Sequence, residues 1–190
     1  RVNAGTYSEA VSIPSSVTHD LYILGEERTR AVIGNGVSTG MAIATSGAAI
    51  YLKDLTIAGT SSVSSLTTSA QAELIMDNVY CVGPVNTTGG IVNSYLNRVR
   101  FGRGWASAGN VNTVYVEDSY FHNSLTSTWT GTAENLFFDH CTFTGTSGPS
   151  FSFTGTGDID VVVFSRCIAS ASGGWGLLHV NSASCSIGYL

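Results

Sequence analysis

The sequence predicts an all-β protein: a parallel β-helix in which three short strands make up each turn of about 22 residues. One local pattern, seen as TVYVEDSYFHN from Thr113, returns along most of the chain. Apolar residues alternate before and after a bend at Asp118, so two short strands meet at a corner. No helical period lies between the copies. Repeats of this length bury their apolar faces only by stacking, and a coil of strands is therefore expected.

The copies of this pattern define the turns. They begin at Ala49, Glu73, Ser94, Asn135 and, with weaker similarity, Asp160 and Leu177. The first inward residue after each corner is taken as a marker, which gives Leu55, Val79, Val99, Ser119, Cys141, Cys167 and Cys185. The longest step between markers runs from Cys141 to Cys167, and the shortest runs from Cys167 to Cys185. The spacing is otherwise nearly constant, which is typical of a β-solenoid.

A third short segment completes each turn. It is expected to begin at Gly40, Val63, Gly89, Gly104, Thr128, Pro149 and Gly174. Each strand should pair with its equivalent one turn later, about 4.8 Å away. The coil is predicted to be right-handed, because crossover connections between parallel strands nearly always are. About seven to eight turns should form a single domain over residues 1–190.

Stacking of the turns sorts residues into columns. Three columns are predicted to build the core: Ile50, Leu74, Ser94, Val114, Leu136 and Val162; Leu52, Met76, Leu96, Val116, Phe138 and Phe164; and Phe101, Phe121 and Phe143. Cysteines are expected inside as packed thiols: Cys81, Cys141, Cys167 and Cys185. Tryptophans are also expected to point inward, the alternative being an outward ladder that stacks on sugars: Trp105, Trp129 and Trp175.

Composition excludes several classes of function. The chain is 43% hydrophobic and only 11% charged, which favours a folded body over disorder. Its net charge is −5 and its basic residues are scattered, so neither nucleic acid nor an anionic membrane is expected as a partner. No apolar run approaches the roughly 20 residues of a membrane-spanning helix. No CxxC pair or His-rich cluster is present, so no metal or other cofactor is predicted.

The opening of the chain carries a resemblance to a known family. It contains AGTYSEAVSIP followed by YILGEERTRAVIGNG, within residues 1–36. These runs resemble the first turns of the pectin-lyase-like superfamily of right-handed parallel β-helices. That superfamily includes pectate lyases, pectin esterases, polygalacturonases, and spike and fibre proteins of bacterial viruses. The resemblance implies the fold more than an activity, because these proteins share a fold and differ in function.

The catalytic motifs of those enzymes are absent from the chain. It lacks the Gly-Tyr-Gln-Asp run of pectin esterases and the Arg-x-x-Pro-Arg element of pectate lyases. It also lacks the Asn-Thr-Asp, paired-Asp and Gly-His-Gly elements of polygalacturonases. The resemblance therefore brings no catalytic residue with it.

One column of polar residues suggests a candidate catalytic site. It lies just before the corners and consists of Lys53, Asp77, Asn97, Glu117, Asp139 and Ser165. Glu117 and Asp139 would lie on adjacent turns about 5 Å apart, the separation of a retaining glycosidase pair. They are the candidate catalytic residues. The alternative is that these side chains end strands and bond to turn backbones, as Asp and Asn commonly do.

Other charged residues gather near the same corners: Asp118, His122, His140, Arg98, Arg100 and Arg103. A carboxylate beside arginines can abstract a proton next to a uronic-acid carboxylate, which is the chemistry of polysaccharide lyases. Scattered ion pairing is the alternative explanation.

An outward column before the corners is unexpectedly apolar: Tyr51, Ile75, Tyr95, Tyr115, Phe137 and Val163. An exposed sheet face normally alternates to polar residues, so this stripe is expected to bind a partner or to be covered. The predicted binding or interface residues are Tyr51, Tyr95, Tyr115 and Phe137. Neighbouring copies of the chain or a polysaccharide are the candidate partners. Residues outside this sequence covering the stripe are the third possibility.

The sequence thus predicts a structural β-helix segment of a virion or cell-surface appendage, similar to a tail spike or fibre. Such a segment would lie outside the cell or on the virion surface and form a homo-oligomer, with a trimer favoured. A polysaccharide-degrading lyase or glycoside hydrolase and a non-catalytic carbohydrate-binding module are the alternatives. The chain starts at Arg1 and stops at Leu190 without capping segments, so a fragment of a longer chain is expected.

Overall fold

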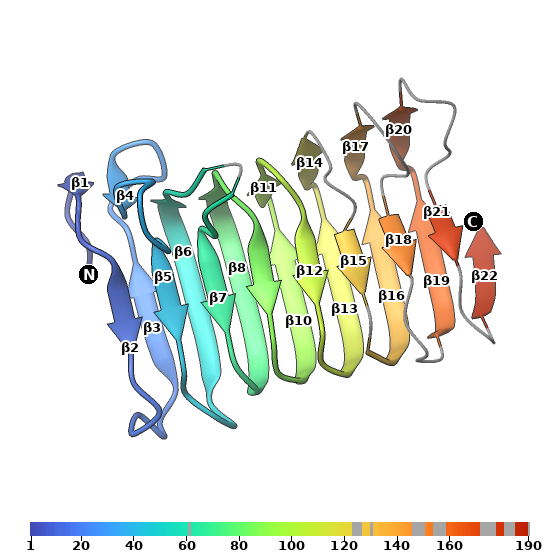
Figure 1. The fold of residues 1–190 in the computed structure, drawn as a ribbon. Coiled ribbons are helices and arrows are strands. Elements are labelled where there is room, and N and C mark those ends of the chain that lie inside the picture. The colour runs from blue at the N-terminus through green and yellow to red at the C-terminus, as the bar shows by residue number, and fades with distance from the viewer. Residues whose placement is uncertain are drawn as a thin grey trace.

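The computed structural model describes residues 1–60, 62–122, 127–129, 131–145, 151–153, 159–171, 178–180 and 185–189. Strands are the only regular elements in these ranges, and they coil into a parallel β-helix (Figure 1). Figure 1 shows the turns stacked in one row from β1 to β22. The predicted fold class is confirmed. The described part of the chain contains no helix that is long and apolar enough to cross a membrane.

Each turn contributes three segments to two sheets. The first segment, before the corner, is formed by β3 (Leu21–Leu24), β10 (Ile91–Asn97), β13 (Val111–Glu117), β16 (Ala133–Asp139), β19 (Ile159–Ser165) and β22 (Cys185–Tyr189). The second segment, after the corner, is formed by β1 (Gly5–Tyr7), β4 (Ala31–Ile33), β11 (Arg100–Phe101), β14 (Tyr120–His122), β17 (Thr142–Gly145) and β20 (Ile168–Ala171). Two strands run through the corner and supply both segments, β6 (Ala49–Ile57) and β8 (Gln71–Cys81). Together these strands form one 14-stranded sheet.

The third segment builds a separate eight-stranded sheet. Its strands are β2 (Val11–Ile13), β5 (Met41–Ile43), β7 (Leu66–Thr68), β9 (Val85–Thr87), β12 (Trp105–Ser107), β15 (Ser127–Trp129), β18 (Phe151–Phe153) and β21 (Leu178–Val180). Along this sheet, each strand pairs in parallel with its neighbours one turn away. Three strands per turn are therefore observed, as predicted.

The register follows the predicted columns. Leu74 pairs with Ile50 and with Ser94, and Val114 pairs with Ser94 and with Leu136. The length of a turn therefore changes little along this column. Because the paired positions of these strands meet their equivalents in the next turn, each turn acts as the template for the following one.

Every corner from that within β6 to that after β19 turns at one residue with a left-handed backbone. The φ angles lie between 49° and 56°, and the residues are Asp54, Asn78, Arg98, Asp118, His140 and Arg166. Asn and Asp tolerate this conformation well, but Arg adopts it only rarely. The stacked neighbours therefore impose the corner geometry, whatever residue type stands there.

The core confirms the inward columns. Phe101, Phe121 and Phe143 stack along the axis with ring centroids 4.6 and 4.8 Å apart. Trp105 is fully buried and lies parallel to Phe101, so its expected inward orientation is confirmed. The side chains of Trp129 and Trp175 lie outside the described residues. Free thiols occupy the core at Cys81 and Cys141, and a third is half-buried at Cys167.

Two expected assignments are wrong. In the turn that follows Cys81, the third segment is β9, which pairs with β7 and β12, and the stretch from Gly89 leads into the next first segment. Both stretches alternate like short strands, so only the register of the neighbouring turns distinguishes them. The last copy, from Leu177, is also misaligned: β21 belongs to the third-segment sheet, and Cys185 pairs with Ile159 before the corner, not with Cys167.

Candidate functional site

The outward apolar column is present and begins one turn earlier than expected. We call it the outer ladder: Tyr22, Tyr51, Ile75, Tyr95, Tyr115, Phe137 and Val163. Its members lie in register on consecutive first segments. Tyr22 is 58% exposed, Tyr95 41% and Tyr115 46%, and the remaining members are half-buried. The described residues therefore leave a continuous apolar stripe open to solvent.

The rings of the outer ladder stack face to face. Tyr95 and Tyr115 have centroids 5.7 Å apart with planes inclined by 5°, and Tyr115 and Phe137 are 4.8 Å apart at 10°. Tyr22 and Tyr51 make a separate pair at 4.3 Å and 6°. Tyr115 has a ring on both of its faces, so it presents an edge and a hydroxyl to solvent. Stacking of a sugar on a free ring face is thus not available at Tyr115.

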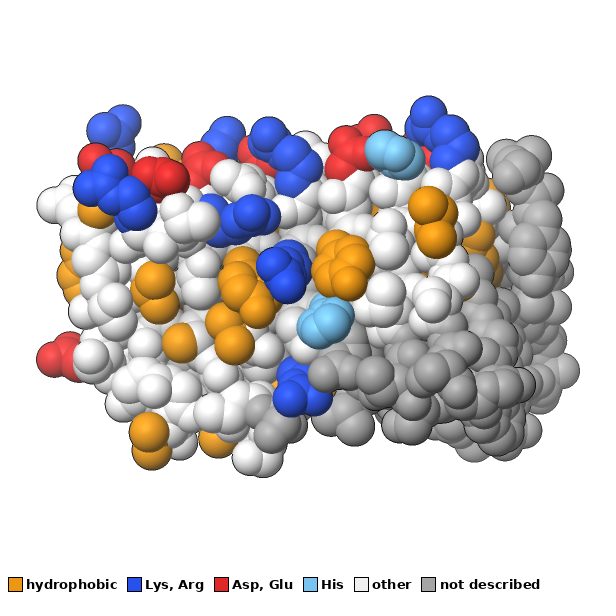
Figure 2. Space-filling view, turned by 90° about the horizontal axis from the view of Figure 1, so that it is seen from above, with side chains coloured by type: hydrophobic (Ala, Val, Ile, Leu, Met, Phe, Trp, Pro, Cys, Tyr) orange, Lys and Arg blue, Asp and Glu red, His pale blue; other side chains and the backbone are white. Residues whose placement is uncertain are grey.

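A line of charged side chains runs along the corners beside the outer ladder. Figure 2 shows acidic and basic groups gathered in this row along one edge of the molecule. The Asp77 carboxylate accepts hydrogen bonds from Arg98 Nη2 at 2.5 Å and Nε at 3.2 Å, and lies 3.1 Å from Lys53 Nζ. Partial burial would raise the pKa of Asp77, but the bonds from Arg98 and Lys53 outweigh it and lower that pKa. These pairs join three successive turns.

Two more pairs extend the row towards the C-terminal turns. His140 Nδ1 lies 2.5 Å from Asp118 Oδ1. Arg166 donates from Nε to Asp139 Oδ1 at 2.9 Å and also contacts Oδ2 of the same carboxylate. Hydrogen bonding by Arg166 lowers the pKa of Asp139. These contacts therefore link the corner side chains of adjacent turns.

The candidate catalytic pair lies side by side. Glu117 and Asp139 are register partners on β13 and β16, so their carboxylates occupy adjacent turns. Glu117 is exposed, whereas Asp139 is half-buried and held by Arg166. A retaining glycosidase needs one carboxyl with a raised pKa to act as general acid. Asp139 has a lowered pKa, so it does not suit the role of that acid. Its two oxygens are also engaged by Arg166, which makes Asp139 a charge-pairing residue between turns.

The basic candidates separate into two groups. Arg98 and Arg100 line one pocket of about 410 Å³, and Arg28, which sequence patterns did not single out, lines it with them. Arg28 lies far ahead of Arg98 in the chain, and no spacing rule links the two positions. Arg103 is not among the residues that line this pocket.

The remaining candidate, His122, belongs to a small polar group on the second segments. Its Nδ1 lies 3.3 Å from the Tyr120 hydroxyl and 3.3 Å from Thr144 Oγ1. This group sits on β14 and β17 and does not include a carboxylate. The group is therefore a cluster of surface hydrogen bonds between Tyr120, His122 and Thr144.

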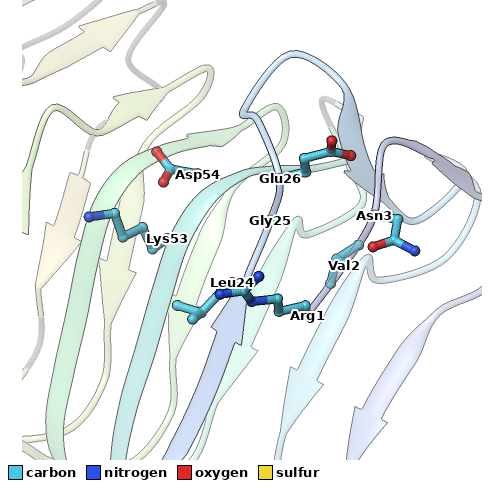
Figure 3. Close-up of a pocket in the computed structure, with 8 residues that line it drawn as sticks. All are labelled: Arg1, Val2, Asn3, Leu24, Gly25, Glu26, Lys53 and Asp54. Atoms are coloured by element: carbon cyan, nitrogen blue, oxygen red, sulfur yellow. The ribbon is translucent and has the colours of Figure 1, made fainter.

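A pocket of about 530 Å³ lies beside the first turns (Figure 3). Figure 3 shows Glu26 and Lys53 well apart, with the chain at Gly25 between them. Both charges already have partners: Glu26 accepts from the Ala4 amide at 2.8 Å, and Lys53 pairs with Asp77. Asp54 has a partner as well, since its Oδ1 accepts from Asn78 Nδ2 at 2.7 Å, so Glu26, Lys53 and Asp54 are all engaged within the protein.

A smaller cleft of about 200 Å³ lies on the outer ladder itself. Its walls combine apolar and polar side chains: Ile75, Met76, Asp77, Tyr95, Leu96, Asn97, Tyr115 and Glu117. An apolar floor with a few polar groups at its rim is the usual composition of a ligand site.

Within the described ranges, no group of three or more His, Cys, Asp or Glu side chains is placed to hold a metal ion. Comparison with family models, with curated proteins and with solved structures finds no match to this chain.

Proposed function

We propose that the chain is a rigid structural segment of a virion or cell-surface appendage, in which copies of the chain associate through the outer ladder. The observation that carries this proposal is the exposure of aromatic rings in register on consecutive turns. An extended apolar stripe on a sheet face is typical of an interaction surface.

A second copy of the chain is the partner that best fits the stripe. Its turns have the same strand spacing, so in parallel copies each turn lies beside the equivalent turn along the whole contact. The exposed ring edges would leave water on association, with a gain of roughly 25 cal/mol per Å² of apolar surface. Three copies around a common axis would close the assembly and cover each stripe once.

The resemblance to the pectin-lyase-like superfamily supports this proposal, because that group includes spike and fibre proteins of bacterial viruses. A location outside the cell or on the virion surface follows from the same proposal. The pairing of Asp139 with Arg166 and the missing enzyme motifs make a polysaccharide-degrading activity the weaker alternative.

Disruption of the outer ladder tests the association. We expect the unchanged chain to sediment as a trimer, and the double variant Tyr95→Ser, Tyr115→Ser to dissociate with a constant raised by roughly 100-fold. Sedimentation equilibrium over a range of concentrations measures this. Ile168→Ser is the matched control, because Ile168 is 66% exposed on a second segment away from the ladder. A monomeric unchanged chain, or equal dissociation of the control, would refute the proposal.

Carbohydrate binding is the second candidate function, and the 200 Å³ cleft favours it. The carboxylates of Asp77 and Glu117 can accept hydrogen bonds from sugar hydroxyls, and the Asn97 amide can both accept and donate them. Only a monomer would leave this cleft open, so the oligomeric state separates the two candidates.

Turnover of a polysaccharide is tested separately. We expect neither the unchanged chain nor the double variant Glu117→Gln, Asp139→Asn to cut polygalacturonate or a neutral glucan, because the Asp139 carboxylate is engaged by Arg166 and the chain lacks the catalytic motifs of these enzymes. Release of new reducing ends and of unsaturated products measures cleavage. Cleavage by the unchanged chain and by the control Glu134→Gln, Asp160→Asn, but not by the double variant, would establish the pair as catalytic and overturn this expectation.

A further inference from the structure

Three basic side chains converge on the second-segment face of an otherwise acidic protein. The chain has eight Lys and Arg residues and a net charge of −5. Arg28, Arg98 and Arg100 nonetheless line one pocket of about 410 Å³ together with Asp118 and Tyr120. Figure 2 shows basic and hydrophobic side chains side by side on this face. Asp77 and Asp118 offset part of this positive charge, and an anion bound in the pocket would offset the rest.

Arg100 is held by two aromatic rings. Its guanidinium carbon lies 4.9 Å from the ring centre of Tyr80 and 5.7 Å from that of Tyr120. These rings are on the turns before and after Arg100, since the three residues are register partners. Aromatic rings cover the faces of a guanidinium, whereas its N–H donors point outward in its plane. No ion pair of Arg100 occurs within the described residues.

Arg98 is fixed by the carboxylate of the preceding turn. Its Nε and Nη2 both donate to Asp77 Oδ1, at 3.2 and 2.5 Å. A guanidinium has five N–H donors, so donors remain after this pairing. The pocket's own carboxylate, Asp118, contacts His140 Nδ1 at 2.5 Å.

Arg28 comes from the loop between β3 and β4. The Thr56 hydroxyl donates to the Arg28 backbone carbonyl at 2.7 Å, which fixes this part of the loop against β6. Arg28 is half-buried, and its side chain has no ion pair in the part of the chain that is described. Two of the three arginines thus offer free donors to the same pocket.

We propose that this pocket binds an oxyanionic group, a carboxylate or a sulfate ester. Arginine forks match the paired oxygens of such groups, and charge-assisted hydrogen bonds to them are stronger than neutral ones. Arg28 and Arg100 provide the donors, and Arg98 adds charge while Asp77 fixes its position. The Tyr120 hydroxyl is bonded to His122 and Thr144, so the ring serves to hold Arg100.

Arginine side-chain NMR signals test the proposal directly. We expect the Nε–Hε signals of Arg28 and Arg100 to shift saturably on titration with glucuronate, glucose 6-sulfate or inorganic sulfate, but not with glucose. Saturation by glucuronate alone would identify a carboxylate as the ligand, and saturation by the sulfates alone would identify a sulfate. Arg100→Gln should weaken the binding at least tenfold, by roughly the contribution of a charged hydrogen bond.

Two further variants complete the test. Arg28→Gln should weaken binding in the same way without removing the guanidinium between the two tyrosines. Arg30→Gln is the control, because Arg30 is exposed, pairs with Glu27 and does not line the pocket. Shifts that do not saturate, equal shifts at Arg30, or unchanged affinity in both Arg28→Gln and Arg100→Gln would overturn the proposal. The pocket lies on second segments and the outer ladder on first segments, so this result does not depend on the association of copies.

Discussion

Replacing Phe121 by alanine is expected to lower the free energy of unfolding by about 3 to 5 kcal/mol, the usual cost of truncating a buried aromatic ring. Phe121 is 2% exposed and stacks between Phe101 and Phe143 at 4.6 and 4.8 Å. It also meets Phe138 edge-on at 6.2 Å. The turns above and below are fixed by strand hydrogen bonds, so the core cannot collapse to fill the space.

The outer ladder supplies the matched control for this prediction. Tyr115→Ala removes a ring that also stacks on two neighbours but is 46% exposed. Because this truncation removes much less buried apolar area, we expect the free energy of unfolding to fall by about 1 kcal/mol. Urea unfolding followed by circular dichroism measures both variants, with the chain kept at concentrations where it is in a single association state. Equal losses for the two variants would contradict the prediction, because the buried Phe121 ring and the exposed Tyr115 ring would then contribute alike.

Replacing Gly109 by alanine is expected to cost about 3 kcal/mol or more, through a clash between backbones. Gly89, Gly109 and Gly131 lie on successive turns at the entry to the first segment. A Cβ atom at Gly109 would lie 2.2 Å from the Gly89 carbonyl carbon, and one at Gly131 would lie 2.2 Å from the Gly109 oxygen. A side chain at one position therefore pushes the adjacent turns apart, and the spacing of the coil cannot absorb this locally.

Gly47→Ala separates the steric cost from the cost of backbone conformation. Gly47 has a φ of 72°, and a Cβ there meets nothing within 4 Å. Alanine at this position should cost only the left-handed conformation, about 1 to 2 kcal/mol. Thermal and urea unfolding of the two variants measure the difference. If Gly109→Ala were no less stable than Gly47→Ala, the result would contradict the close approach of adjacent turns at Gly109.

The columns could be predicted because strand alternation and turn length depend on neighbours in sequence. Period-two alternation placed Val114 inside and Tyr115 outside, and a roughly constant turn length then aligned them with their equivalents. The third segment predicted from Gly89 and the corner position predicted for Cys185 were wrong. In each of these two turns, two stretches of the sequence alternate equally well. In a coil, only the neighbouring turns decide between them.

The site was only partly predictable for a related reason. The neighbouring positions of Glu117 and Asp139 follow from the register, but the pairing of Asp139 with Arg166 depends on side-chain geometry at the left-handed corner. Tyr22 and Arg28 were missed because they lie before the regular repeats. Leu21 pairs with Ile50, and the step between these two positions is longer than any used in the alignment.

Localisation of the outer ladder in the assembled state tests the central claim most directly. An experimental structure of the assembled protein should place the exposed edges of Tyr95 and Tyr115 at the interface between copies, with matching turns at the same height. Aromatic edges that remain in contact with water in the assembly, with the copies joined through another face, would contradict the account.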